Sequence, residues 1–205
     1  MENIAIIGSG GYAYAVKDIV CSLGIYVFKG FVGKEGDSAS EYNETNLKRL
    51  KDDNIFCLVN GVGNISYPWF ERMIMKYQAG GFRFPPIVHP SSVVSKSSKV
   101  GDGSVVFENA VIKSNSFVEQ FCIINSLSVV SHDCKVGDYS HISLGAKTGG
   151  GCEIGKNSFL GINSSVIQGK KIGDNVIIGA GAVVISDIPD GVVAVGNPAK
   201  VIKRR

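Results

Sequence analysis

The spacing of apolar residues divides the chain into two parts. Over the first 84 residues, strand-like apolar runs at 3–7, 25–32 and 55–59 alternate with helix-compatible stretches at 12–23 and 69–77. Such alternation with short connections predicts a small parallel sheet covered by helices. Pro85 and Pro86 follow, so we expect an α/β domain at 1–84 and a second domain at 85–205.

In the second part an aliphatic residue returns at every sixth position from Val88 to Val184, with Thr148 as the exception. A helix repeats every 3.6 residues and a strand every two, so neither explains this pattern. A chain of short strands joined by tight turns explains the six-residue period. In such a chain one aliphatic and one small residue of every six point inward, and successive coils stack on one another. We therefore predict an all-β parallel β-helix of hexapeptide repeats, three to a coil. The period does not fix the hand of the coil, and a β-sandwich is much the weaker alternative because its turns come at irregular intervals.

Composition narrows the partners and the compartment. The net charge is +3, and basic residues are spread thinly except at 203–205, so nucleic acid is not an expected partner. No apolar run approaches the roughly 18 residues that span a bilayer, and the first residues lack the basic start and cleavage site of a signal peptide. We expect a soluble cytoplasmic protein without membrane insertion. The five cysteines contain no C-x-x-C pair, which argues against a disulfide framework and a zinc ribbon.

One of the three histidines occupies a special position in the predicted coil. Because a coil has eighteen residues, His132 should lie about 4.8 Å from Gly150 on the next coil, within the three glycines at 149–151 that follow Thr148. Glycines let a ligand approach backbone N–H groups, and a histidine beside Asp133 can take a proton near neutral pH. A thioester carbonyl would suit such donors. The alternative is a flexible glycine turn beside an exposed corner histidine.

The other two histidines do not converge on this position. His141 is half a coil from His132, so within one chain the two lie on different faces and can meet only across a subunit interface. His89 stands beside Pro90 at the domain junction, without acidic or glycine-rich neighbours. A catalytic zinc site of three imidazoles is therefore disfavoured, and we expect no metal. A metal hydrolase or a mere binding scaffold is the minor alternative.

Gly8-Ser9-Gly10-Gly11 follows the first predicted strand and opens a helix, as a phosphate-binding loop does. Ala13 breaks the full dinucleotide-binding pattern, and the end of the second strand, at 31–34, carries no acidic residue to hold a ribose. A nicotinamide cofactor is therefore disfavoured. A nucleotide carried by the substrate is compatible with this loop.

Three motifs together make the chain resemble a known family over essentially its whole length. They are the glycine loop at 8–11, Ser131-His132-Asp133-Cys134 within the hexapeptide repeats, and the sequence GNPAK at 196–200. The chain resembles the bacterial sugar O- and N-acetyltransferases of the NeuD/PglD type. The resemblance implies a Rossmann-like first domain, a left-handed parallel β-helix, a homotrimer, and acetyl-CoA bound between neighbouring helices. The implied acceptor is sialic acid or a nucleotide-linked 4-amino-6-deoxy sugar.

The resemblance also implies roles for individual residues. His132 resembles the general base, and Asp133 the acid that orients it. Contacts to acetyl-CoA are implied for His141, Gly150, Ile162 and Ala180. Contacts to the acceptor are implied for Gly10, Gly11, Tyr12, Ala13, Gly63 and Asn64. Relatives usually carry His where this chain has Tyr12, and an acid near Gly33, so the identity of the sugar and of its nucleotide stays open.

These expectations define one activity and its alternative. We predict an acetyl-CoA-dependent N-acetyltransferase that acts on a nucleotide-linked amino sugar of the 4-amino-4,6-dideoxy type for bacterial surface glycan synthesis. Transfer is expected to be direct, without an acyl-enzyme. The base chemistry of O-transfer is the same, so a sialic acid O-acetyltransferase is the alternative. N-transfer is favoured because a glycine-rich phosphate loop suits a nucleotide-linked acceptor better than a free acid.

Overall fold

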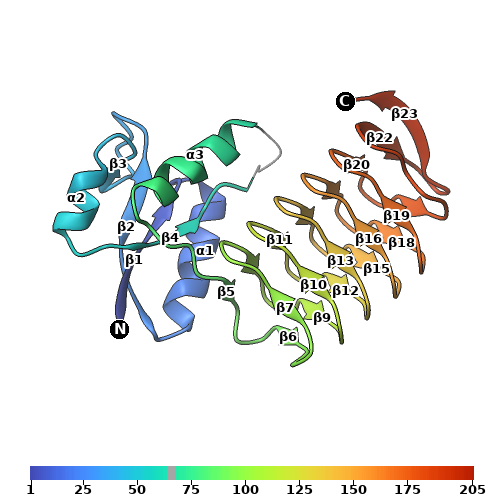
Figure 1. Cartoon of the computed structure of the whole chain (residues 1–205), viewed down its shortest axis with the longest axis horizontal. Coiled ribbons are helices and arrows are strands. Elements are labelled where there is room, and N and C mark those ends of the chain that lie inside the picture. The colour runs from blue at the N-terminus through green and yellow to red at the C-terminus, as the bar shows by residue number, and fades with distance from the viewer. Residues whose placement is uncertain (64–67) are drawn as a thin grey trace. The chain divides into compact units, whose positions relative to one another are not determined.

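The computed structural model describes residues 1–63 and 68–205, the side chain of Pro68 excepted. The chain forms two compact units, Met1–Pro90 and Ser91–Arg205. Figure 1 shows the helices and the sheet of the first unit and the stacked coils of the second. The expected combination of an α/β part and a β-helix is confirmed.

The first unit is built around a parallel sheet with the strand order β3-β2-β1-β4. Its strands are β1 (Glu2–Ile7), β2 (Tyr26–Gly33), β3 (Tyr42–Asn43) and β4 (Cys57–Asn60), followed later in the chain by β5 (Ile87–Val88). Its helices are α1 (Gly11–Ser22), α2 (Leu47–Asp52) and α3 (Pro68–Ala79). Arg83 extends the sheet by a parallel bridge to Cys57.

The core of this unit follows from the positions of its apolar residues. Ile4, Ala5 and Ile6 of the central strand β1 are fully buried, and because successive side chains point to opposite faces, both faces of the strand are covered, as expected for a parallel strand. Helix α1 buries Ala13, Val16 and Val20, whose spacing of three and four residues places them on one helical face. This packing holds the start of α1 at the end of β1, where the glycine loop lies.

The second unit is a β-helix whose strands stack with a step of eighteen residues. Phe117 pairs with Lys135, and Lys135 pairs with Glu153. One sheet has the order β19-β16-β13-β10-β7, the second β21-β18-β15-β12-β9-β6, and the third contains β23-β22-β20-β17-β14-β11-β8. The strands are β6 (Val93–Val94), β7 (Lys99–Val100), β8 (Val105–Val106), β9 (Val111–Ile112), β10 (Phe117–Val118), β11 (Ile123–Ile124), β12 (Val129–Val130), β13 (Lys135–Val136), β14 (His141–Ile142), β15 (Lys147–Thr148), β16 (Glu153–Ile154), β17 (Phe159–Leu160), β18 (Ser165–Val166), β19 (Lys171–Ile172), β20 (Ile177–Ile178), β21 (Val183–Val184), β22 (Val192–Val195) and β23 (Lys200–Arg204).

Each coil turns three corners, which we name after residues that mark them. The histidine corner joins β9 to β10, β12 to β13, β15 to β16 and β18 to β19. The asparagine corner joins β10 to β11, β13 to β14, β16 to β17 and β19 to β20. The isoleucine corner joins β11 to β12, β14 to β15, β17 to β18 and β20 to β21. The second sheet, which contains β12 and β15, therefore lies between the isoleucine corner and the histidine corner.

One residue at each corner adopts a left-handed backbone conformation, with φ between 54° and 71°. Glycine, asparagine and aspartate tolerate this conformation better than other residues. These positions recur every six residues: Gly103, Asn109, Asn115, Phe121, Leu127, Asp133, Tyr139, Gly145, Gly151, Asn157, Asn163, Gly169, Asn175 and Gly181. Asp133 thus occupies the left-handed turn position of its corner.

Small polar side chains inside the coils satisfy backbone groups of neighbouring coils. The hydroxyl of Ser116 donates to Ser131 O at 2.5 Å and accepts from Cys134 N–H at 3.1 Å. Ser140 repeats the pattern with Gly155 O and Ser158 N–H. Ser116 and Ser140 thus connect their coils to the next, and each hydroxyl is paired both as a donor and as an acceptor.

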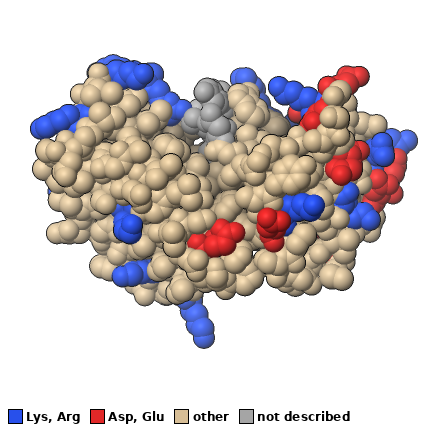
Figure 2. Space-filling view, turned by 180° about the vertical axis from the view of Figure 1, so that it is seen from behind, with Lys and Arg blue, Asp and Glu red and all other residues tan. Residues whose placement is uncertain are grey.

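Charged side chains lie in separate small groups on the face displayed in Figure 2.

No helix in the described part of the chain has the length and apolar character needed to cross a bilayer.

Candidate active site

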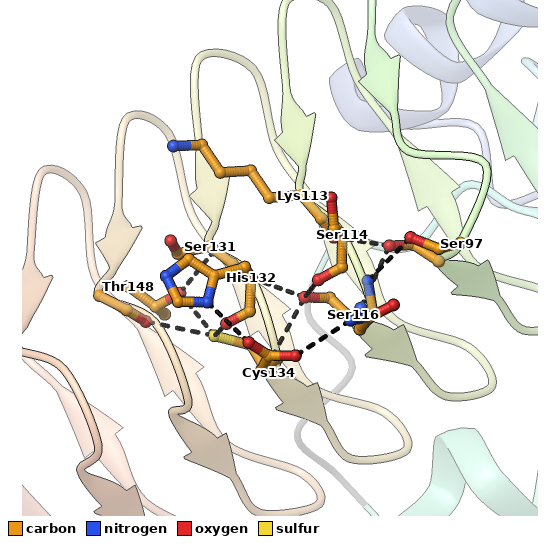
Figure 3. A network of polar contacts seen from close by, with 12 residues as sticks. Ser97, Lys113, Ser114, Ser116, Ser131, His132, Cys134 and Thr148 are labelled. Carbon is orange, nitrogen blue, oxygen red and sulfur yellow. Dashed lines mark hydrogen bonds and ion pairs between the residues drawn. The ribbon is translucent and has the colours of Figure 1, made fainter.

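His132 and Asp133 form a close pair on the histidine corner, just after β12. The distance from His132 Nδ1 to Asp133 Oδ2 is 2.7 Å, and the two side chains are 60% and 58% exposed. The turn places Asp133 with φ 57°, so its carboxylate points back along the corner toward the imidazole. Figure 3 shows this imidazole beside Ser131, Cys134 and Thr148. The pair is open to a ligand.

Asp133 is fixed on its other side by the preceding coil. Its N–H donates to Ser114 O at 2.9 Å, and its Oδ1 accepts from Asn115 Nδ2 at 3.3 Å. The hydrogen bond to His132 holds the pKa of Asp133 below its usual range, and the bond from Asn115 adds to this. An ionised carboxylate only accepts, so Nδ1 of His132 carries a proton and Nε2 keeps its lone pair in the neutral ring. Nε2 is therefore the basic atom.

Gly150 lies directly against this imidazole, one coil further on. Gly151 N–H donates to His132 O at 2.9 Å, which fixes the two turns to each other. A methyl group at position 150 would lie 2.5 Å from His132 Nε2, closer than real contacts allow. Only glycine leaves the imidazole in this place, as the eighteen-residue step predicts.

The N–H of Gly150 differs from its equivalents on the asparagine corner. There, Lys156 N–H donates to Asp174 Oδ1 at 2.8 Å, and Gln120 N–H donates to Asp138 Oδ1 at 2.9 Å. Within the described part of the chain, Gly150 N–H has no such acceptor. A donor beside Nε2 is thus available to a ligand oxygen.

Thr148, the exception in the aliphatic series, lies inside the coil under this corner. It is 5% exposed, and its hydroxyl accepts from Ser131 N–H at 3.1 Å. Cys134 Sγ lies 3.5 Å from the Thr148 hydroxyl and donates to Gly149 O at 3.2 Å. A hydrogen bond with the neighbouring Cys152 thiol lowers the pKa of Cys134, but Cys134 is 1% exposed and faces the core. These side chains brace the corner rather than face the ligand.

His141 occupies the third sheet, away from His132 within the β-helix. Its ring packs edge-on against Phe159 with centroids 5.0 Å apart, its Nε2 lies 3.3 Å from Asn125 Nδ2, and the residue is 8% exposed. Ile162 and Ala180 lie one coil apart on the isoleucine corner, and Ile162 is 47% exposed. The structure therefore does not bring these three residues to His132 and Gly150 within one chain.

The glycine loop of the first unit offers an open surface at the start of α1. Gly10 precedes the helix without a side-chain cap, and a Cβ at Gly10 or Gly11 would meet nothing within 4 Å. A Cβ at Gly63 would lie 3.1 Å from Tyr12 Cγ, so the Tyr12 ring fills the space beside Gly63. Burial raises the pKa of Tyr12 well above its usual range. Ala13 is buried in the core, and Asn64 lies outside the described residues.

The sequence analysis missed a carboxylate at the glycine loop. Asp37, four residues beyond the end of β2, accepts from the hydroxyls of Ser9 and Ser40, and from Ala39 N–H at 3.0 Å. The Ser40 bond, followed by that of Ser9, lowers the pKa of Asp37. A Cβ at Gly33 would overlap Asp37 Oδ2, so the loop folds an acid over the glycine that ends β2. The signal in the sequence is an acid three residues beyond the segment 31–34 at the end of β2.

Asn115 was also missed, although the coil step could have found it. It lies eighteen residues before Asp133, at the same turn position. The step of eighteen residues that pairs His132 with Gly150 also pairs Asp133 with Asn115, on the preceding coil.

Comparison with known proteins gives consistent matches. Residues 151–186 match the family model "Bacterial transferase hexapeptide (six repeats)". The structure of PerB from Caulobacter crescentus, in complex with CoA and GDP-perosamine, is 31% identical with a TM-score of 0.92, and the match covers 99% of this chain and 98% of that one. The acetyltransferase domain of PglB from Neisseria gonorrhoeae is 31% identical with a TM-score of 0.89, covering 98% and 100%.

A curated relative is similar over a shorter stretch. UDP-N-acetylbacillosamine N-acetyltransferase from Bacillus subtilis is 34% identical over 114 residues, which is 51% of this chain and 51% of that protein. The aligned part of the chain thus spans about half the length of that relative.

Proposed function

This chain belongs to the family of bacterial hexapeptide-repeat transferases, and on that premise we propose that it transfers the acetyl group of acetyl-CoA to the amine of a nucleotide-linked amino sugar. The 4-amino-4,6-dideoxy sugars are the proposed acceptor class. The observation that carries the proposal is the placement of His132 Nε2 against Gly150, beside an N–H without an acceptor among the described residues. Support for donor and acceptor comes from the PerB structure, whose ligands are CoA and GDP-perosamine.

The proposed chemistry is a direct acyl transfer. The amine nitrogen attacks the thioester carbonyl carbon, and His132 Nε2 takes the proton that the amine loses. The carbon–sulfur bond breaks, and the imidazolium returns the proton to the departing thiolate sulfur. Gly150 N–H donates to the carbonyl oxygen as negative charge develops on it. Asp133 keeps Nδ1 protonated, so the ring presents Nε2 throughout.

We propose that the active enzyme is a homotrimer, because one chain holds the two halves of the candidate acetyl-CoA site on separate corners. His132 and Gly150 lie on the histidine corner, whereas Ile162 and Ala180 lie on the isoleucine corner, and the second sheet separates them. The outward positions of that sheet are uncharged except for Lys147: Val93, Val111, Val129, Ser165 and Val183. Those of the first sheet include Lys99, Lys135, Glu153 and Lys171. A neighbouring chain packed along the uncharged face would bring opposite corners together.

Mixing two inactive variants tests this shared site. We expect His132→Ala and Ile162→Glu each to lose activity. Co-assembled in equal amounts, they should recover about a quarter of the wild-type rate, because a quarter of randomly formed interfaces join two intact halves. Light scattering should give three times the mass of one chain. No recovery in verified mixed trimers would contradict a site built from two chains.

The first unit, which we expected to span 1–84, is the proposed acceptor-binding part. The open N-terminus of α1 suits a diphosphate, with Gly10 and Gly11 free of steric obstruction. Asp37 stands where an acid can accept hydrogen bonds from ribose hydroxyls. These bonds would replace the hydrogen bonds that Asp37 accepts from the Ser9 and Ser40 hydroxyls. We also propose a cytoplasmic location, because all five cysteines are free thiols, as is usual in a reducing compartment.

The decisive experiment is an acetyl-transfer assay with a panel of acceptors. UDP-, dTDP-, GDP- and CMP-linked 4-amino sugars and free sialic acid are each incubated with acetyl-CoA, and the products are identified by mass spectrometry. We expect an increase of one acetyl group on the amine of one nucleotide-linked sugar. Acetylation of free sialic acid alone would overturn the proposal in favour of O-transfer.

A further inference from the structure

Asn115 donates from Nδ2 to the Oδ1 of Asp133 at 3.3 Å, while the other oxygen of Asp133 faces His132 Nδ1 at 2.7 Å. Three consecutive groups, an amide, a carboxylate and an imidazole, thus form one line across two coils. We propose that Asn115 is a positioning residue for the acetyl transfer, which fixes the carboxylate that holds the proton on Nδ1. The inference rests on the proposed function of His132.

The backbone of Asn115 is itself held in place by the coil before it. Asn115 N–H donates to Ser97 Oγ at 3.1 Å, and Ser97 N–H bonds to Ser95 Oγ at 3.4 Å. Figure 3 shows Ser97 beside Ser116 and Ser114, which lie on the Asn115 turn. Asn115 also adopts φ 57°, which limits the paths its side chain can take. The amide reaches Asp133 from a fixed turn rather than from a free surface side chain.

The Asp133 carboxylate needs the hydrogen bond from Asn115 because it is exposed to solvent. Asp133 is 58% exposed, and an exposed carboxylate without a second partner can rotate away from its neighbour at little cost. If it rotates, the imidazole loses the contact that keeps the proton on Nδ1, and the tautomer with a protonated Nε2 gains population. In that tautomer Nε2 already carries a proton, so it cannot accept the proton of the amine.

The ionisable groups around the turn limit what else could produce a pH effect. On the histidine corner, over residues 113–117, 131–135 and 149–153, those other than His132 are Lys113, Asp133, Lys135, Glu153 and the buried thiols Cys134 and Cys152. The turn residues Gly149, Gly150 and Gly151, which follow one coil further on, have no side chains and so add no ionisable group. A new charge at position 115 would therefore act on the Asp133–His132 pair first.

The asparagine corner offers a matched control. Asn157 adopts φ 54° and donates from Nδ2 to Asn175 Oδ1 at 2.6 Å, also one coil further on. It repeats the geometry of Asn115 without a histidine. Glycine and aspartate both tolerate this backbone conformation, so neither substitution should unfold the turn. Asn115→Gly removes the side-chain amide, and Asn115→Asp replaces its N–H donor with a negatively charged acceptor.

The test compares Asn115→Gly and Asn115→Asp with Asn157→Gly and Asn157→Asp. We expect Asn115→Gly to lower kcat about 5- to 20-fold with KM for both substrates within about twofold, whereas Asn157→Gly keeps the wild-type kcat. In Asn115→Asp the acidic limb of the kcat profile should move to higher pH, because the added negative charge favours the imidazolium. Wild-type kcat and an unmoved limb in the Asn115 variants, or equal losses in both pairs, would overturn the proposal.

A second measurement needs no substrate. Long-range 1H–15N couplings of 15N-histidine-labelled protein report which ring nitrogen of His132 carries the proton, and His132→Gln assigns the signal. We expect the Nδ1–H form in the wild type and in the Asn157 variants, and a mixture with the Nε2–H form in Asn115→Gly. An unchanged tautomer would overturn the role of Asn115 whatever the acceptor assay shows. A changed tautomer in a chain that acetylates no sugar would instead count against the proposed function alone.

Discussion

The histidine corner and the asparagine corner share one backbone and differ in chemistry. Both place a residue in the left-handed conformation at the turns described above, and both carry an amide that donates to the next coil, from Asn115 to Asp133 and from Asn157 to Asn175. On the asparagine corner an aspartate of the following coil accepts the turn N–H, as at Lys156. On the histidine corner that N–H, at Gly150, has no acceptor among the described residues.

A repeating fold can acquire a site through side chains alone. The coil supplies the spacing everywhere, so a histidine at one turn and a glycine at the next bring a base and a donor together without any change of backbone. The asparagine corner is closed by its own side chains, whereas the histidine corner is left open. The proposed function requires that a capping interaction be absent at Gly150 as well as that a base be present at His132.

The largest expected effect comes from removing the base. We expect His132→Ala to lower kcat by about 10²–10⁴-fold, because general-base assistance is typically worth that much, while acetyl-CoA binding is retained. Steady-state kinetics and calorimetric titration measure the two effects. Lys156→Ala, at the equivalent position on the asparagine corner, should keep the wild-type rate. A His132→Ala enzyme with more than a tenth of that rate would exclude the role of general base.

A smaller but informative effect is expected from Gly150→Ala. Its methyl group would lie 2.5 Å from Nε2, so the imidazole must move, and we expect kcat to fall about 10- to 100-fold. The fold should be destabilised by about 1–3 kcal/mol, as in other overpacked sites. Urea unfolding of Gly150→Ala, measured in the wild-type and His132→Ala backgrounds, distinguishes a clash with the His132 ring from strain in the turn. If the contact is the cause, the destabilisation disappears when His132 is absent; an equal loss in both backgrounds would place the strain in the turn itself.

The six-residue pattern was enough to predict the β-helix and the pairing of His132 with Gly150. Both depend only on the chain step, and the structure confirms the step from Phe117 to Lys135 to Glu153. The same step predicted that His141 lies on a different face. Roles for these residues stay predictions, because they depend on ligands and on neighbouring chains.

Other features could not be predicted from periodicity. Asp37 reaches Ser9 only because the loop after β2 folds back over Gly33, and a loop path is set by tertiary contacts rather than by a repeat. The N–H of Gly150 has no acceptor among the described residues, and Gln168 stands where the asparagine corner carries Asp174. A repeat pattern identifies which positions are equivalent, but the hydrogen bonds arise from the side chains that differ between them.

The smallest effect concerns the charge of Asp133, which distinguishes its corner from the neutral Asn157–Asn175 pair. Its pKa is held below the usual value of about 4, chiefly by the bond to His132. The resulting stabilisation is present above the unfolded value and is lost as the pH falls through the folded value. Asp133→Asn, which tolerates the same turn, should therefore melt about 1–3 °C below the wild type at pH 6, and the gap should close toward pH 3. Differential scanning calorimetry across this range measures it, with Asp102→Asn as a control elsewhere on the β-helix. A gap that persists unchanged at pH 3 would mean that shape rather than charge ties Asp133 to its neighbours, and would leave the two corners alike in their electrostatics.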